Sequence, residues 1–256
     1  MVVIAIAALF GACGGRENRT DTAVPIATAT VVPVEPVAPP PPPLVIDTAG
    51  GVVISLFFVA VDRGRQADET RRLVEHLQAD LTLVPGFVSA TLLASGDGSS
   101  LLVAVAWDDS VGVVQGDMML AGWLRLPADT ALRRTRDGTL TPRVAIRRTT
   151  GAPPVLRDGA MVQVTRYVMK PGHSFGALAV LAGGNLAMRV LQDTAAQGGA
   201  LLSAADSGAL YMVLQARNAT ALAPVFGVPT TALPFWAPFA SREEQLMAVV
   251  AIVTRP

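Results

Sequence analysis

The chain repeats itself at a spacing of about 108 residues, and this duplication constrains its fold more than any other feature. The segment VVISLFFVAVDRGRQ (52–66) returns as AMVQVTRYVMKPGHS (160–174), and Gly64 matches Gly172 at an offset of 108. A later hairpin returns in 200–218 at nearly the same offset. Units of this length are domains, whereas the units of a solenoid are much shorter. The sequence therefore predicts two related domains.

Each predicted domain reads as strand, helix, strand, strand, helix, strand, which is the ferredoxin-like βαββαβ order. In the first domain the expected elements are a strand at 52–61, an amphipathic helix at 67–84, a hairpin at 87–95 and 100–107, and a closing strand at 142–148. One helix layer leaves the other face of each sheet bare, so each sheet needs a cover. We therefore expect an α+β fold in which two ferredoxin-like repeats, 46–150 and 151–256, close sheet to sheet into an intramolecular barrel.

The N-terminus resembles a bacterial lipoprotein signal. Residues 1–13, MVVIAIAALFGAC, form an apolar run that ends in small residues and Cys13, the single cysteine. The Pro-rich residues 14–45 lack the apolar content of a core and predict a disordered tether, in which the stretch 31–45 alone spans on the order of 45 Å. The prediction is an exported lipoprotein of the bacterial envelope, anchored to a membrane through Cys13. The alternatives are a short buried segment and a proline-rich ligand for a partner.

Charge and composition exclude several functions. The formal net charge is zero and no basic stripe occurs, which argues against a nucleic-acid surface. Two histidines and one cysteine leave little to ligate a transition metal, and no phosphate loop or dinucleotide fingerprint is present. We expect no metal and no cofactor, and a monomer that acts as a pseudo-dimer.

The stretch PGFVSATLLASGDGSSLLVAVAWDD, which follows a strand and an amphipathic helix, resembles the antibiotic biosynthesis monooxygenase (ABM) domain. The marks are Pro85-Gly86-Phe87, the Gly-Asp-Gly turn of the hairpin, and Trp107-Asp108 at the end of its second strand. The resemblance implies a dimeric α+β barrel. It also implies relatives that include cofactor-independent oxygenases making quinones and enzymes that degrade haem.

The family's catalytic residues carry over poorly. The quinone-forming relatives place an Asn four residues before the Trp, where this chain has Val103. The haem-degrading relatives place an Asn on the first strand, where this chain has Phe57 and, in the second repeat, Thr165. Neither His76 nor His173 matches the iron-ligating histidine of those relatives, which argues against haem degradation.

Four residues are candidates for a ligand pocket between sheet and helices: Phe57, Val103, Trp107 and Asn185. Trp107 is also the single, weak catalytic candidate, because it could stack on an aromatic substrate. Its alternative role is to fill the core. Asn185 falls in an apolar stripe of Leu178, Leu181, Met188 and Leu191, and a buried amide there could face a ligand. Alternatively, Gly183-Gly184 break the helix and Asn185 caps its second half.

Three functions fit these observations, and the sequence leaves open whether the chain is an enzyme. The first is an envelope-anchored protein that binds a small apolar or aromatic ligand in a barrel pocket. The second is a cofactor-independent monooxygenase acting on an aromatic quinone precursor, since such chemistry can rely on a desolvated pocket. The third is a non-catalytic scaffold of the envelope.

Overall fold

The computed structural model describes residues 44–48, 52–108, 110–123, 132–147, 153–194, 196–204, 209–217 and 236–255. All of them belong to one compact unit that spans 40–256. The predicted signal with Cys13, and the predicted tether as far as residue 43, lie outside the described residues. The lipid anchor therefore stays a prediction.

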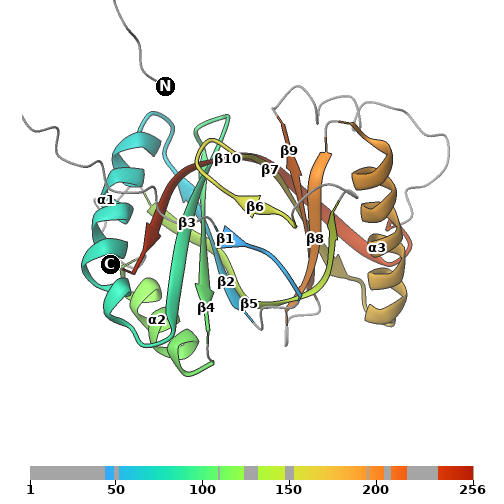
Figure 1. The fold of residues 1–256 in the computed structure, drawn as a ribbon, viewed down its shortest axis with the longest axis horizontal. Helices are drawn as coiled ribbons and strands as arrows, with labels where there is room; N and C mark the ends of the chain where they lie inside the picture. The colour runs from blue at the N-terminus through green and yellow to red at the C-terminus, as the bar shows by residue number, and fades with distance from the viewer. Residues whose placement is uncertain are drawn as a thin grey trace, which may run out of the picture. The chain divides into compact units, whose positions relative to one another are not determined.

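The chain alternates strands and helices in a fixed order (Figure 1). The elements are β1 (Leu44–Val45), β2 (Val53–Val61), α1 (Gln66–Ala79), a 3₁₀ turn (Leu81–Leu83), β3 (Phe87–Ser95), β4 (Ser100–Trp107), α2 (Ser110–Trp123), β5 (Leu132–Arg147), β6 (Val155–Leu156), β7 (Met161–Met169), α3 (Phe175–Gln192), β8 (Ala196–Ala204), β9 (Ala209–Ala216) and β10 (Ala240–Thr254). The fold is α+β, as predicted. The hairpin expected at 87–95 and 100–107 is confirmed by β3 and β4.

Eight strands close into one antiparallel barrel in the order β10-β3-β4-β2-β5-β8-β9-β7. The long strands β5 and β10 join its two sides. Leu140 of β5 pairs with Ile54 of β2 and also with Ala204 of β8. Met247 of β10 pairs likewise with Val162 of β7 and with Ser95 of β3. Closure leaves none of these eight strands as an exposed edge, which removes the main aggregation risk of a sheet.

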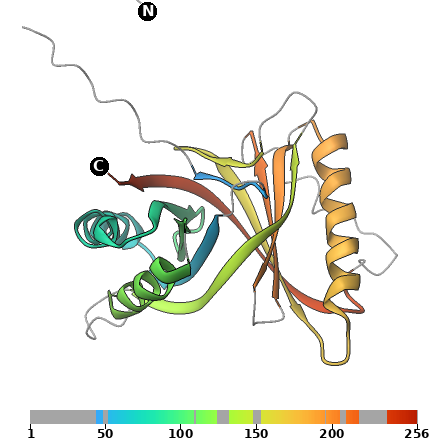
Figure 2. The ribbon, with the colours of Figure 1, turned by 60° about the horizontal axis from the view of Figure 1, so that its bottom comes forward.

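The helices lie on the outside of the barrel (Figures 1 and 2), and strands beneath them, such as β4 and β9, are buried on both faces. On β4, Leu102 and Ala104 point into the barrel, whereas Val103 and Val105 point toward α1 and α2. This double burial explains why β4 reads as an unbroken apolar run instead of an alternating one. On the other side, α3 approaches β8 so closely that a Cβ on Gly199 would lie 2.4 Å from Leu186 Cδ1.

A two-stranded ribbon of β1 and β6 lies over one mouth of the barrel, toward the viewer in Figure 1 and at the top in Figure 2. Leu44 pairs with Leu156, and the Ile46 amide donates to the Pro154 carbonyl at 3.0 Å. The side chains of Leu44, Ile46 and Leu156 are buried in the interior core. The end of the expected tether thus differs from the sequence prediction, because 44–45 form a strand that helps to fill the barrel.

The helix α3 corrects two details of the sequence analysis. It runs unbroken through Gly183-Gly184, so the proposed helix break with a cap at Asn185 is wrong. Its buried face is also different, because Ala182 and Val190 face the barrel while Leu181 and Met188 are exposed. The buried face instead repeats every four residues, at Leu178, Ala182, Leu186 and Val190, and the absence of a side chain at Gly199 makes room for Leu186.

Candidate functional site

The indole of Trp107 is fully buried and tightly enclosed. Its Nε1 donates to the Ser55 hydroxyl at 3.1 Å, and Phe87 meets its ring edge to face with centroids 6.0 Å apart. Two glycines of α2 make room for it. A Cβ on Gly116 would lie 2.0 Å from Cη2 of the indole, and one on Gly112 would lie 3.2 Å from its Cε3. Trp107 therefore fills the space between β4 and α2.

The four predicted pocket residues do not come together. Phe57, Val103 and Trp107 share one buried cluster beneath α1 and α2. Asn185 is half-buried on α3, which packs against β8 and β9 instead. A ligand pocket lined by all four is therefore not formed in this structure, and a pocket beneath α1 and α2 stays a prediction.

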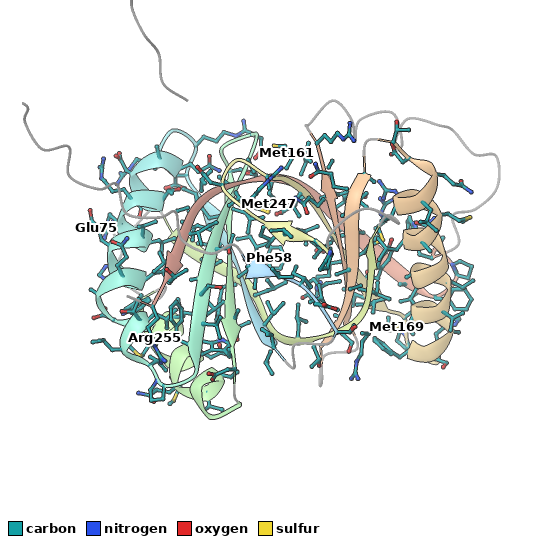
Figure 3. The ribbon with its side chains drawn as sticks, viewed as in Figure 1. Phe58, Glu75, Met161, Met169, Met247 and Arg255 are labelled. Carbon is teal, nitrogen blue, oxygen red and sulfur yellow. The ribbon has the colours of Figure 1, made fainter. Side chains whose placement is uncertain are left out.

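The barrel interior is apolar and nearly full. Twelve aliphatic side chains line a cavity of about 20 Å³, enough for the centre of one water-sized sphere. Phe58 and Met247 also point into this interior (Figure 3). The barrel itself therefore offers no room for a ligand while the β1–β6 ribbon stays in place.

A polar cluster lies between β7 and α3. On β7, Val162 and Val164 point into the barrel, and Gln163, Thr165 and Tyr167 alternate with them. These three side chains are at most 1% exposed. Because successive side chains on a strand point to opposite faces, all three face the α3 side. Polar side chains therefore occupy a position that is apolar in most helix–sheet packings.

Hydrogen bonding within this cluster is incomplete. Arg189 of α3 donates from Nη2 to Oε1 of Gln163 at 3.1 Å. A guanidinium can only donate, so this bond fixes the orientation of the amide and leaves Nε2 as a free donor. Neither Nε2 of Gln163 nor Oγ1 of Thr165 has a hydrogen-bond partner among the described residues. Buried polar atoms are almost always paired, either with protein groups or with ordered water, so these two atoms are candidates to bind a water molecule or a ligand.

Burial also perturbs the ionisable groups of the cluster. Desolvation raises the pKa of the Tyr167 phenol, and the nearby charges of Arg242 and Arg189 partly oppose that rise. Desolvation lowers the pKa of the Arg189 guanidinium, which nevertheless keeps its charge at any pH that a protein tolerates. The charge of the nearby Asp193 carboxylate partly opposes the fall in the pKa of Arg189, so this cation already has an anionic neighbour. Perturbed groups of this kind concentrate at functional sites.

The two sides of the barrel differ at equivalent positions in the register. Trp107 ends β4 and pairs with the first residue of β2, whereas Ala216 ends β9 and pairs with the first residue of β7. Ser55 on β2, which receives the indole hydrogen bond, corresponds in this register to Gln163 on β7. The position of Trp107, whose indole is hydrogen-bonded, is therefore taken on the other side of the barrel by the methyl group of Ala216. Beside Ala216, the Nε2 of Gln163 lacks a partner among the described residues.

The sequence analysis missed Gln163 and considered Thr165 only as a mismatch to haem-degrading relatives. The signal was the alternation in VQVTRY (162–167), with valine on one face and polar residues on the other. Both histidines lie elsewhere, His76 against Trp123 and His173 against Phe239. Among the described residues, no group of three or more His, Cys, Asp or Glu side chains could hold a metal ion.

Comparison with solved structures identifies the fold. An anthrone oxidase-like protein matches with a TM-score of 0.66 at 11% identity, over 84% of this chain and 97% of that one. A proposed monooxygenase from Fusobacterium nucleatum subsp. nucleatum has a TM-score of 0.53 at 8% identity, over 81% and 96% of the two chains. A chlorite dismutase mutant from Candidatus Nitrospira defluvii has a TM-score of 0.50 at 10% identity, over 80% and 93%.

No protein-family model matches the sequence. No curated protein matches it either. Identities this low establish the fold and not the activity. The chain therefore shares with these solved structures an α+β fold, here with one closed barrel of eight strands.

Proposed function

We propose that this chain binds a small aromatic molecule that carries a carbonyl or phenolate oxygen, in the space between α3 and the barrel. The observation that carries the proposal is the pair of buried donors on β7, Nε2 of Gln163 and Oγ1 of Thr165. A buried polar group without a partner costs about 1–3 kcal/mol. A ligand oxygen that accepts from both groups would offset that cost.

The surroundings of these donors define the rest of the ligand. Leu186 and Val190 of α3 and Met212 of β9 belong to the same buried cluster as Tyr167. Apolar walls of this kind favour a flat ring over a charged or flexible group. The buried cation of Arg189 favours an oxygen with negative charge, so an acidic phenol or an enolisable ketone matches better than a plain hydrocarbon.

Ligand binding is tested by thermal shift with a panel of naphthols and hydroxylated anthrones. Native protein should be stabilised by some members of the panel, whereas Thr165→Val should lose most of that shift. The matched control is Thr91→Val, because Thr91 is fully buried and its hydroxyl also lacks a partner among the described residues, but it lies on β3. The proposal fails if no member shifts the native protein, or if both variants lose the shift equally.

A second candidate function is a cofactor-independent monooxygenase acting on an anthrone-like quinone precursor. Two donors and a buried cation would stabilise the anion that such a substrate forms when it loses a proton to solvent. Dioxygen then converts the substrate methylene to a carbonyl, with one oxygen atom entering the product and the other leaving as water. The likeness to an anthrone oxidase-like fold and to a proposed monooxygenase supports this candidate.

Oxygen uptake separates catalysis from binding. With an anthrone as substrate, Thr165→Val should reduce uptake by about tenfold or more if the β7 donors hold the anion. Thr91→Val should leave uptake unchanged, and so should Trp107→Phe wherever circular dichroism reports it folded. Absence of uptake by native protein would exclude the oxygenase candidate and leave the binding proposal intact.

The same proposal includes a tandem origin of the barrel and its anchoring in the bacterial envelope. Equivalent elements support the duplication, since β7 begins 108 residues after β2, and β8 and β9 each begin 109 residues after β3 and β4. The apolar run 1–13 and the Pro-rich tether support anchoring. Metabolic labelling with palmitate tests it, because native protein should incorporate label and Cys13→Ser should not.

A further inference from the structure

The helix α3 is apolar on both of its faces. Its inner face packs on the barrel through Leu178, Ala182, Leu186 and Val190, which are all fully buried. Its outer face exposes Val180 at 76%, Leu181 at 40%, Met188 at 54% and Leu191 at 58%. By length and composition α3 is the one helix among the described residues that could cross a membrane. A helix that is apolar all round normally has a cover on every side.

The outer face of α3 carries no charge at all. Arg189 is the one charged residue of its 18, and it turns inward to donate to Gln163. On the opposite side of the barrel, α1 has the ordinary surface of a soluble helix, with Asp68, Arg71 and Glu75 exposed. Glu75 is labelled on this helix in Figure 3.

The helix α2 also exposes apolar side chains, Val114 at 61% and Met118 at 66%, but it carries Asp117. The exposed apolar face of α3 is the larger of the two, with four such side chains and no charge.

We infer that the outer face of α3 lies on the surface of a lipid bilayer. An 18-residue helix is about 27 Å long and presents a stripe of roughly 300 Å². A stable protein dimer needs about 800 Å² on each partner, so a second copy of the chain is a poor cover. A bilayer needs no matching shape, and an interfacial helix is held by the apolar area that it buries.

The chain outside the described residues favours the same cover. Its N-terminal part, before Leu44, contains the predicted Pro-rich tether that follows the predicted lipidation site, Cys13. A tethered surface meets its membrane at a high effective concentration, so even a weak apolar stripe binds it. This argument rests on the anchoring included in the proposed function. With α3 on the bilayer, the candidate site beneath this helix would lie close to lipid-soluble molecules that partition from the bilayer.

Site-specific fluorescence tests the inference. Cys13→Ser removes the only cysteine and with it the predicted anchor, so a histidine tag at the N-terminus holds the protein on the vesicles through a nickel-chelating lipid. Val180→Cys then accepts an environment-sensitive label on an exposed position of α3. The matched control is Glu75→Cys, labelled on the outer face of α1. With vesicles of phosphatidylcholine, the label at 180 should shift to the blue and be quenched by nitroxide-labelled acyl chains, whereas the label at 75 should show neither effect. Vesicles that contain phosphatidylglycerol should give the same result, because the stripe carries no charge.

A second substitution guards against a trivial effect of the label. Met188→Asp lies two turns from residue 180 on an exposed position, so it should not unfold the protein, and it should weaken vesicle binding at 180 by about tenfold or more. Equal quenching at 75 and 180, or none at 180, overturns the inference. So does a blue shift that follows protein concentration and not lipid, which would indicate a second copy. Ligand binding measured without vesicles is independent of these outcomes, so the proposed function can stand or fall separately.

Discussion

A double-mutant cycle between α2 and β4 tests whether Trp107 is a packing residue. The perturbations are Gly116→Ala and Trp107→Phe, singly and together. In the native background a Cβ on Gly116 would meet the indole carbons Cη2 at 2.0 Å and Cζ2 at 2.4 Å. Overpacking of this kind costs about 1–3 kcal/mol, and the better helix propensity of Ala offsets up to about 1 kcal/mol. We expect the free energy of unfolding to fall by about 1–2 kcal/mol.

The phenylalanine ring lacks the indole atoms that the new methyl group would strike. Trp107→Phe alone should lower the free energy of unfolding by about 2–4 kcal/mol, because it leaves a cavity and removes the hydrogen bond to buried Ser55. In that background Gly116→Ala should instead raise the free energy of unfolding by about 0.5–1 kcal/mol through helix propensity. The coupling energy between the two positions is then about 2 kcal/mol.

Guanidinium unfolding followed by far-ultraviolet circular dichroism measures all four proteins without relying on tryptophan fluorescence. The control is Gly122→Ala, also on α2, whose Cβ would have no atom within 4 Å. Its effect should be the same with Trp or Phe at position 107. Additive effects of Gly116→Ala and Trp107→Phe, within about 0.5 kcal/mol, would refute the packing role and reopen a functional one for Trp107.

Three further predictions follow from single residues. Thr165→Val should raise the free energy of unfolding of ligand-free protein by about 1 kcal/mol in chemical denaturation, because an unpartnered buried hydroxyl is replaced by a methyl group. Gly184→Ala should raise it by about 0.5–1 kcal/mol, because Gly184 lies inside α3 with open space around its Cβ position. Hydrogen bonds from Ser95 and Ser99 lower the pKa of Asp97 to about 2. A lowered carboxyl pKa contributes stability above the unfolded value of 3.8, and that contribution is lost as the pH falls through about 2. Asp97→Asn should lack this acid-dependent step in pH titrations of unfolding, and the step is small, below about 1 kcal/mol, because the carboxylate is exposed.

The sequence predicted the first side of the barrel well because local signals decide its structure. The glycines of the turn around Asp97 and the apolar runs on either side defined β3 and β4 to the residue. The long strands β5 and β10 were less predictable. Their two ends pair with different neighbours, so each half of either strand is determined by a partner far away in the chain. Only the barrel as a whole specifies that register.

The candidate site was missed for a related physical reason. A polar face that alternates with valine normally indicates a strand with one face in water, and β7 has that pattern at Gln163 and Thr165. Here α3 covers the polar face, so those side chains are buried. The helix α3, which covers this face, is itself apolar on both its inner and its outer side. A polar strand face therefore packs against an apolar helix, which neither pattern predicts. Propensity and periodicity describe each element alone, whereas the conflict arises only when the two elements pack.

The proposed function therefore assigns different roles to the two sides of the barrel. On the side of α1 and α2, Trp107 occupies the helix–sheet space and its one polar atom is satisfied by Ser55. On the side of α3, the corresponding strand end is Ala216. There, the buried Nε2 of Gln163 and Oγ1 of Thr165 have no hydrogen-bond partner among the described residues. A stable protein tolerates the free-energy cost of such unsatisfied groups because well-packed cores elsewhere stabilise it, and a bound ligand would offset that cost.

Unsatisfied buried groups and exposed apolar side chains also occur elsewhere, in the Thr91 hydroxyl of β3 and in the exposed Val114 and Met118 of α2. On the side of α3, two unsatisfied donors and an uncharged helix face occur together. An apolar aromatic ligand delivered through a membrane surface would account for both.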